Sequence, residues 1–285
     1  FRRVLFRSVL TVTSTDDTGT PCTPTSCTLR GAIMAANASG GSAVINFNIA
    51  PPGPKAITIG AGADNPLPAI TGSDIVLDAT TQPGGGPTGI RLDDPDIGDR
   101  ETGLVLQGKR ITVRGFAITR FDGFGIWLTS TARDNIIAGN RIGTADGTTA
   151  LGTKDDGIRV QGGGGHRIGG TTAAERNIVS GNNGIGIQLL GTMRADGTCA
   201  SPEQNLVQGN YAGLNVNAAK PSPYGNKGAG IELGVCARNN TIGGSAAGAA
   251  NVASGNHDDG IQLDGRDGPG GTGAVCGNTI EGNIA

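Results

Sequence analysis

Gly186-Ile187-Gln188-Leu189 is one of five copies of a short phrase in the C-terminal half of the chain. The other copies begin at Gly125, Gly157, Gly230 and Gly260, and each pairs a glycine with an isoleucine and ends on an aliphatic residue. By subtraction of their numbers, the five isoleucines stand 32, 29, 44 and 30 residues apart. Repeats of this period are typical of arrays in which each unit stacks on its neighbours. The phrase therefore predicts a solenoid rather than a globular core.

Alternation within the phrase predicts which side chains face the interior of the solenoid. Successive side chains of a strand point to opposite faces, so the isoleucine and the aliphatic residue two positions later should stack inward as two ladders. The residue between them should face outward. This outward column, which we propose as a ligand-binding face, comprises Trp127, Arg159, Gln188, Glu232 and Gln262.

A second element, with Asn at both ends and Gly before the last Asn, recurs between the phrases. It occupies Asn135–Asn140, Asn177–Asn182, Asn205–Asn210, Asn251–Asn256 and Asn278–Asn283. Asparagine tolerates left-handed conformations and bonds to nearby backbone groups, and stacked asparagines can form amide ladders. Each repeat thus has at least two short strands separated by turns, and the fold class is all-β, a parallel β-helix.

The composition supports thin aliphatic stacks with many turns. Glycine accounts for 52 of 285 residues and aromatic residues for only 3%. The formal net charge is −2 and no basic run occurs, so nucleic acid is not an expected partner. No apolar stretch approaches the ~18 residues of a membrane span, and no linker divides the chain, so we expect one continuous domain.

The N-terminal part divides into three expected segments. Residues 1–8 resemble the translation of a sequencing-library adapter, with a basic strand as the alternative, and would then lie outside the fold. Residues 9–44 should form a strand, a polar loop and a short helix with Thr28 as its N-cap and Asn37 near its end. A helix here would cap the open end of the solenoid. Residues 45–285 should form the β-helix, which we expect to be truncated at the C-terminus.

The segment Cys27-Thr-Leu-Arg-Gly-Ala-Ile33 resembles the Cys-Ser-Leu-Arg-Glu-Ala motif of a family of bacterial extracellular proteins. The stretches 67–84 and 168–182 are similar to the segments that follow this motif and to the repeats of its right-handed, pectin-lyase-like parallel β-helix. The resemblance implies secretion or surface display and no particular activity. Gly31 stands where the family motif has Glu, and we expect fraying there because glycine costs about 1 kcal/mol within a helix.

Five cysteines fit an oxidising compartment. Cys22 and Cys27 are close enough to form a disulfide before the helix, with two free thiols as the alternative. Cys236 and Cys276 precede similar Asn-Thr-Ile elements and form the second candidate pair. The partner of Cys199, which also precedes such an element, stays open. The spacing does not match a zinc site.

Paired carboxylates raise the alternative of a carbohydrate-active enzyme, a polysaccharide lyase, hydrolase or epimerase. Asp155-Asp156 and Asp258-Asp259 both directly precede a Gly-Ile pair. A turn or cap role in each coil explains a repeated pair without catalysis. His166 and His257 are the only histidines, and no lyase constellation accompanies them. We therefore assign no catalytic residue and favour a protein that is not an enzyme.

Asp93, Asp94, Asp96 and Asp99 make calcium a candidate ligand, against a simple solvated acidic loop. No other cofactor is expected. The run 162–165 consists of glycines, but it lacks the Lys-Ser/Thr pair of a phosphate loop, so it should be a corner.

Two function classes remain open. The first is a secreted or cell-surface scaffold, adhesin-like, that binds a polysaccharide or another surface protein. The second is the carbohydrate-active enzyme. The long interval between Ile187 and Ile231 should discriminate them, because its loops 191–204 and 216–226 either roof the outward column with charged groups or stand apart from it.

Overall fold

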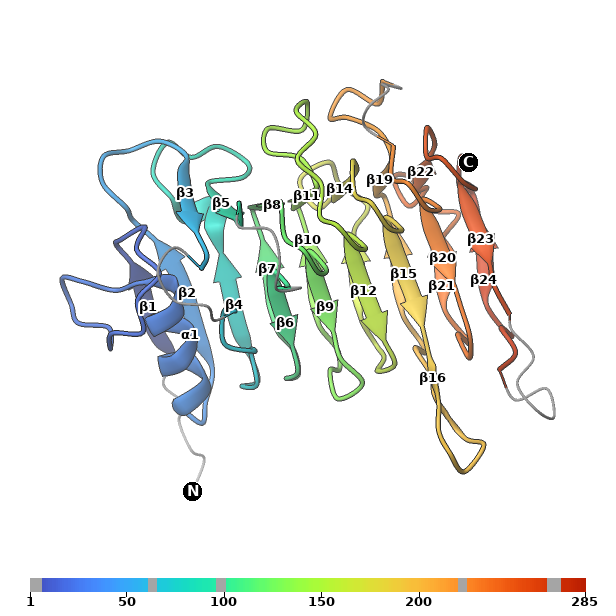
Figure 1. Ribbon diagram of the computed structural model, residues 1–285, viewed down its shortest axis with the longest axis horizontal. Helices are drawn as coiled ribbons and strands as arrows, with labels where there is room; N and C mark the ends of the chain where they lie inside the picture. Colours follow the sequence, from blue (N-terminus) through green and yellow to red (C-terminus); the bar gives the residue numbers. More distant parts are fainter. Residues whose placement is uncertain (1–6, 61–65, 96–100, 220–224, 266–272) are drawn as a thin grey trace.

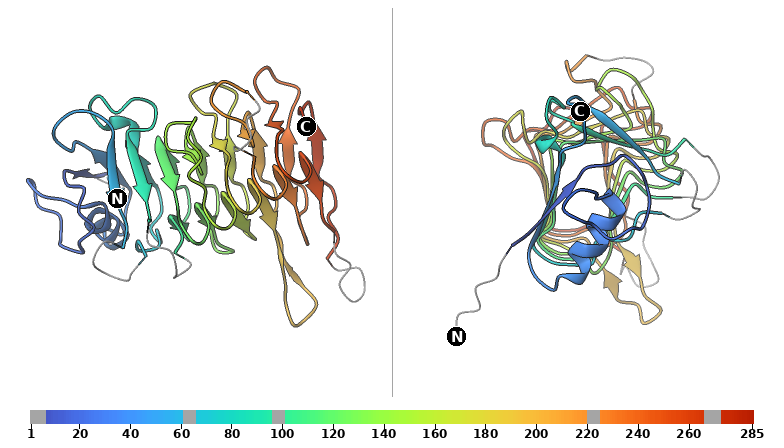
Figure 2. Two further views of the ribbon diagram at one scale, coloured as in Figure 1. Left: turned by 45° about the horizontal axis from the view of Figure 1, so that its top comes forward. Right: turned by 90° about the vertical axis from the view of Figure 1, so that its left-hand side faces the viewer.

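The computed structural model describes residues 7–60, 66–95, 101–219, 225–265 and 273–285 (Figure 1). Three long sheets, which we call A, B and C, contain parallel strands only and wind around one core. The left view of Figure 2 shows the strands stacked along the long axis of the molecule, and the right view looks along this axis. The predicted parallel β-helix is confirmed.

Within each sheet, the strands follow one another along the solenoid in the order of the chain. Sheet A consists of β1 (Ser8–Val12), β2 (Ala43–Phe47), β4 (Ile75–Asp78), β7 (Thr112–Arg114), β10 (Ile136–Ala138), β13 (Arg167–Gly169), β18 (Leu206–Gln208), β21 (Thr241–Gly243) and β24 (Thr279–Glu281). Sheet B consists of β3 (Lys55–Thr58), β5 (Ile90–Asp93), β8 (Phe116–Thr119), β11 (Arg141–Ile142), β14 (Ile178–Val179), β19 (Tyr211–Ala212) and β22 (Val252–Ala253). Sheet C consists of β6 (Leu104–Leu106), β9 (Ile126–Leu128), β12 (Ile158–Gln161), β15 (Ile187–Leu190), β20 (Ile231–Leu233) and β23 (Ile261–Leu263).

The repeated phrase forms the strands of sheet C in the predicted register. Ile158 pairs with Ile126 on one side and with Ile187 on the other, and the ladder continues to Ile231 and Ile261. The first four of these isoleucines have no exposed surface. Burial of a full aliphatic side chain contributes about 2 kcal/mol, so these columns and their counterparts in sheets A and B supply most of the stabilisation.

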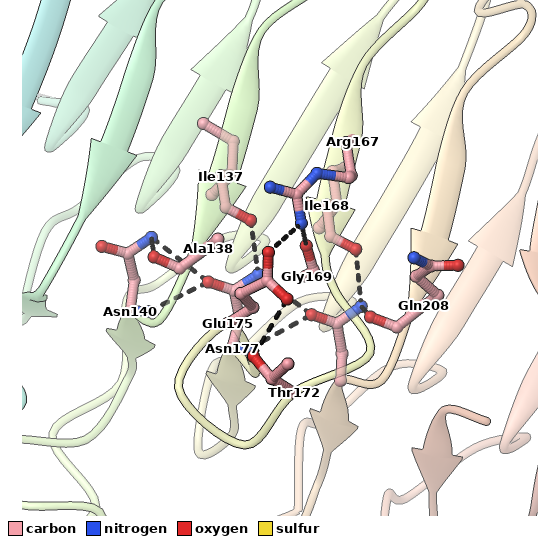
Figure 3. Close-up of polar contacts among 11 residues, drawn as sticks. Ile137, Ala138, Asn140, Arg167, Ile168, Gly169, Thr172, Glu175, Asn177 and Gln208 are labelled. Carbon is pink, nitrogen blue, oxygen red and sulfur yellow. Dashed lines mark hydrogen bonds and ion pairs between the residues drawn. The ribbon is translucent and has the colours of Figure 1, made fainter. Parts of the chain in front are cut away.

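Asparagine side chains form hydrogen-bonded ladders between neighbouring coils at three corners. Between sheets A and B, Asn140 donates to Asn177 (3.2 Å), and Asn177 donates to the carbonyl of Ile137 (2.8 Å) (Figure 3). Asn177 also donates to Asn210 (2.9 Å) in the next coil. Two further ladders run through Asn205 and Asn240 and through 182, 226 and 256. The predicted amide ladders are confirmed.

The ladders also show that the recurring Asn element does not mark one position in the coil. Asn135–Asn140 encloses the sheet A strand β10, whereas Asn177–Asn182 encloses the sheet B strand β14. Asn177 therefore stacks on Asn140 and not on Asn135. The two corners have the same sequence signature because each needs an amide that bonds both to the next coil and to the backbone.

Helix α1 (Leu29–Ala38) covers the N-terminal end of the core, beside β1 and β2 (Figure 2). Thr28 is its N-cap and accepts a hydrogen bond from the amide of Gly31 (3.0 Å), as predicted. The expected fraying at Gly31 is wrong. A β-carbon at this residue would lie 2.4 Å from the carbonyl oxygen of Thr20, so close packing of the preceding loop explains a glycine in a continuous helix.

Other features of this end refine the expected boundaries. The first strand starts at Ser8, which pairs with Ala43, while residues 1–6 of the adapter-like segment lie outside the described residues. A short 3-10 turn, η1 (Ala79–Thr81), follows β4. No helix among the described residues is long and apolar enough to cross a membrane.

Two disulfides are present, and one of them corrects a prediction. Cys22 is bonded to Cys27, as predicted. Cys236 is bonded to Cys199 rather than to Cys276, which is free and exposed. The segment after β15 explains the difference, because it forms a hairpin of β16 (Thr192–Met193) and β17 (Cys199–Ala200) that brings Cys199 back to the coil of Cys236. Figure 1 shows this hairpin extending away from the solenoid.

Candidate functional site

The outward column of sheet C is in register across five neighbouring strands. Trp127 pairs with Arg159, Arg159 with Gln188, Gln188 with Glu232, and Glu232 with Gln262. The column is less exposed than the alternation predicts. Gln188 and Glu232 are 7% and 6% exposed, and the other three residues are partly buried. These side chains are packed into their surroundings instead of standing free in solvent.

Arg159 is held from two sides. Its guanidinium forms an ion pair with Asp156 on the same coil (2.7 Å) and lies over the ring of Phe124 on the preceding coil, 5.1 Å from the centroid. The Phe124 ring in turn contacts Trp127, with centroids 5.8 Å apart. Arginine stacks readily on aromatic faces. The cluster therefore fixes the position of a cation between an aromatic pair and a carboxylate.

Gln188 and Glu232 form the other half of the site. The amide of Gln188 donates to Glu232 Oε1 at 2.6 Å. Burial raises the pKa of the Glu232 carboxyl, and this rise outweighs the lowering by the Gln188 hydrogen bond, while the charges of Asp264 and Asp156 raise it further. Burial also raises the pKa of Asp156, against the hydrogen bond from the amide of Ile185 and the Arg159 pair.

Three polar atoms of the column are buried without a hydrogen-bond partner within the described structure: Trp127 Nε1, Arg159 Nε and Gln188 Oε1. They belong to consecutive strands, β9, β12 and β15. An unsatisfied buried polar group costs about 1–3 kcal/mol, so three on one face are unusual for a purely structural surface.

The two aspartate pairs of the sequence have different surroundings. Asp156 is 3% exposed, and one of its oxygens accepts a bond from the amide of Ile185 in the next coil (2.7 Å). Asp258 and Asp259 are both exposed. The predicted turn role therefore fits Asp258 and Asp259. Asp156 instead belongs to the charged cluster on sheet C, through its ion pair with Arg159. Asp155 accepts a bond from the Asp156 amide.

The two histidines lie apart from the sheet C cluster. His166 is buried in an asparagine ladder, where its Nδ1 accepts a bond from the amide of Asn135 (3.1 Å) and its own amide donates to Asn205. Burial lowers the pKa of His166 to about 3, so the ring is neutral at physiological pH. His257 is exposed and contacts Asp258.

The acidic loop after β5 is only partly described. Asp93 is buried and bound by Arg120 (2.8 Å from Nε) and by Thr119, and Asp94 is also buried. Asp96 and Asp99 lie outside the described residues. In the described parts of the chain, no three acidic, histidine or cysteine side chains are grouped to hold a metal ion. Calcium binding stays a prediction.

The long loops and the glycine run complete the comparison with the sequence. The loop 191–204 stands apart from the outward column as the β16–β17 hairpin. The loop 216–226 is described except for residues 220–224. Gly162, Gly163 and Gly165 have φ values of +71°, +77° and +71°, which confirms a tight corner.

Sequence reasoning missed two members of the site, Phe124 and the functional setting of Asp156. Both occupy the position directly before the Gly-Ile pair, and their coils are neighbours: the amide of Gly125 bonds to the carbonyl of Asp156. The sequence did contain a signal for them. The residue directly before the Gly-Ile pair differs in chemical type from copy to copy, unlike the glycine and isoleucine that follow it. Chemically, the arrangement offers two buried carboxyls with raised pKa values, a fixed cation and an amide on one face.

Comparison with known proteins gives a family and no activity. No curated protein matches the sequence. A family model described as "Protein of unknown function (DUF1565)" matches residues 68–267, which include all of the strands of sheet C. This match covers well over half of the chain and coincides with the repeats that build the β-helix. The chain belongs to the DUF1565 family of β-helix proteins of unknown function.

Proposed function

We propose that this chain is an extracellular β-helix protein that binds an extended polysaccharide along the outward column of sheet C. The observation that carries the proposal is the row of three partnerless polar atoms on β9, β12 and β15. Sugar hydroxyls both donate and accept hydrogen bonds, so a chain of sugars that displaces the side chains covering these atoms can satisfy the two donors and the one acceptor.

The geometry of the column supports a polymer rather than a compact ligand. Its residues repeat once per coil, about 4.8 Å apart. The ring of Trp127, which is partly exposed, offers an apolar face at one end, and Gln262, also partly exposed, offers an amide at the other. Because the polar groups between them are already oriented by Asp156 and Glu232, little side-chain entropy is lost when a ligand binds.

Extracellular location is part of the proposal. Two disulfides in a chain of this kind favour an oxidising compartment. The resemblance of residues 27–33 to the Cys-Ser-Leu-Arg-Glu-Ala motif of bacterial secreted and surface proteins points the same way.

The test uses the two ends of the column, since Trp127 and Gln262 are uncharged and partly exposed, so their removal leaves no charge without a partner. We expect the Trp127→Ala and Gln262→Ala variants each to weaken binding to a polysaccharide that the wild type retains in affinity electrophoresis, by about tenfold for the tryptophan. Thr241→Ala, on the outer face of sheet A, is the matched control. Unchanged affinity in the Trp127→Ala, Gln262→Ala double variant would refute the proposal.

The raised pKa values of Asp156 and Glu232 favour a second candidate, cleavage or epimerisation of the bound polysaccharide. A carboxyl whose pKa is raised by burial is suited to act as a general acid. In that case Glu232→Gln should abolish the release of reducing ends or of unsaturated uronate, detected by ultraviolet absorbance, while binding persists. Absence of both products from every polysaccharide that binds would leave binding as the function.

A further inference from the structure

A groove lies on the outer surface of sheets A and B, where the chain turns at Gly139-Asn140. Its volume is about 920 Å³, and the strands β7, β10, β11 and β14 contribute to it. A neighbouring hollow of about 620 Å³ over sheet B shares Pro87, Thr88 and Arg141 with it. The two form one depression that crosses several coils. We call it the arginine groove.

Small residues create the depression. On sheet B, Arg91, Ala117 and Arg141 occupy one outward column on three successive strands. Two strand steps separate the two arginines by about 10 Å, and the alanine between them leaves space. On sheet A, Ala138 follows Arg114 in the same way.

The groove carries far more positive than negative charge, although the chain as a whole has a formal net charge of −2. Its acidic lining residues are Asp146 and Glu175. Its cationic lining residues are Lys55, Arg91, Arg114, Arg141, Arg167 and Arg176. A cleft lined by one sign of charge concentrates ligands of the opposite sign.

Some of these arginines are neutralised within the protein. Arg114 forms an ion pair with Asp78 and Arg91 with Asp93. Arg167, which lines the groove, donates to Glu175 (2.8 Å) and to the carbonyl of Gly169 (2.6 Å) (Figure 3).

Arg141 and Arg176 differ from them, because no described carboxylate lies within 4.0 Å of either guanidinium. Arg141 is partly buried at the junction of the two hollows and donates to the carbonyl of Asp146 (2.7 Å) and to Thr88 Oγ1 (3.3 Å). Arg176 lies over the ring of Tyr211, 4.1 Å from its centroid, and donates to the carbonyl of Gly209. Both cations are therefore positioned by neutral groups.

A cation in such a place has an energetic cost that a ligand can remove. Burial lowers the pKa of Arg141, while the charge of Asp146 raises it. A partly desolvated charge without a counter-ion is destabilising. A bound anion would supply a counter-ion in direct contact with Arg141, at the point where the two hollows meet.

We propose that the arginine groove binds a polyuronate, a polysaccharide with a carboxylate on each sugar, through Arg141 and Arg176. The planar fork of arginine matches a carboxylate in two parallel hydrogen bonds. Charges on successive sugars suit cations that are distributed over several coils. Ile136, Ala138 and Ala173 give the groove an apolar floor for sugar rings. The described lining contains no aromatic side chain, so it offers no platform for stacked nucleic-acid bases.

This site is independent of the proposed function of sheet C. The groove lies over the outer faces of sheets A and B, and none of its lining residues belongs to a strand of sheet C. Variants of one surface leave the other intact, so failure of one proposal does not affect the other.

Calorimetry with an oligogalacturonate of defined length and with its methyl ester tests the proposal. We expect the wild type to bind the acid, to bind the uncharged ester much more weakly, and to lose affinity as ionic strength rises. Arg141→Gln and Arg176→Gln should each weaken binding by about tenfold or more, as expected when a charge-assisted hydrogen bond is lost. Arg141→Lys keeps the charge without the fork and should have an intermediate affinity.

Arg238→Gln is the matched control, because it removes an exposed arginine that is paired with Glu203 away from the groove. Its affinity for the oligogalacturonate should equal that of the wild type. Melting curves establish that each variant is folded. Equal affinity for the acid and the ester, unchanged affinity in the Arg141→Gln, Arg176→Gln double variant, or equally tight binding of a single-stranded oligonucleotide of the same charge would overturn the proposal.

Discussion

The outer face of sheet C and the arginine groove are both polar surfaces on strands of the same β-helix. They differ in whether their charged side chains have partners within the protein. On sheet C, Arg159 has its carboxylate in Asp156, 2.7 Å away, and Glu232 has its donor in Gln188. In the groove, the Arg141 guanidinium donates to a hydroxyl and a backbone carbonyl, and no described carboxylate lies within 4.0 Å of it. On sheet C the charges have internal partners, and the groups left for a ligand are single polar atoms of Trp127, Arg159 and Gln188. In the groove, the charge itself is left for a ligand.

The largest expected effect is the loss of an internal partner. Arg159→Met should lower the free energy of unfolding by about 3 kcal/mol, because it leaves the buried carboxylate of Asp156 without its cation. Arg141→Met leaves no carboxylate without a partner. The substitution removes two hydrogen bonds to neutral groups and one unpaired charge, so the free energy of unfolding should fall by about 1 kcal/mol or less. Urea titrations of the two variants provide the measurement. Equal losses would mean that the two surfaces do not differ in the way described.

A smaller effect distinguishes the surfaces by pH. The pKa of Glu232 is raised by burial, so the stability that this group contributes is fully present below its unfolded pKa of about 4.3 and is lost as the pH rises through the folded value. Glu232→Gln keeps a neutral side chain at every pH. The variant should therefore gain stability relative to the wild type as the pH rises from 4 to 8, by about 1 kcal/mol. Thermal melts of both proteins across this pH range provide the measurement. The same pH dependence of stability in the variant and in the wild type would contradict the assignment.

The smallest effect has the opposite sign. Asp146, at the rim of the groove, accepts hydrogen bonds from the amides of Thr148 and Thr149 (2.7 Å each), which lower its pKa to about 2. Its contribution is present above the unfolded pKa of about 3.9 and is lost as the pH falls through the folded value. Because the side chain is exposed, Asp146→Asn should cost less than about 1 kcal/mol at pH 7. The cost should vanish near pH 2 in the same melts, and a constant cost would argue against an electrostatic origin.

Much of the fold follows from particular residues in the sequence. The isoleucine ladder from Ile126 to Ile261, the cap helix begun by Thr28 and the Cys22–Cys27 disulfide are all as predicted. These features depend on local chemistry: alternation in a strand, a hydroxyl at a helix start and two thiols five residues apart. The candidate site was only half predictable, since the members of the column were identified but their mutual pairing and burial were not.

What the sequence by itself determined is the stack: a repeat of Gly and Ile at coil length, with one outward residue per coil, can bury its aliphatic side chains only by piling coil on coil. Only the tertiary structure decided how coils with the same signature are phased. It set Asn177 on Asn140, joined Cys199 to Cys236, and brought Arg91 and Arg141 to either side of Ala117. The physical reason is that loop lengths fix which positions of successive coils become neighbours, so contacts between coils separated by ~25–50 residues depend on three-dimensional register rather than on local pattern.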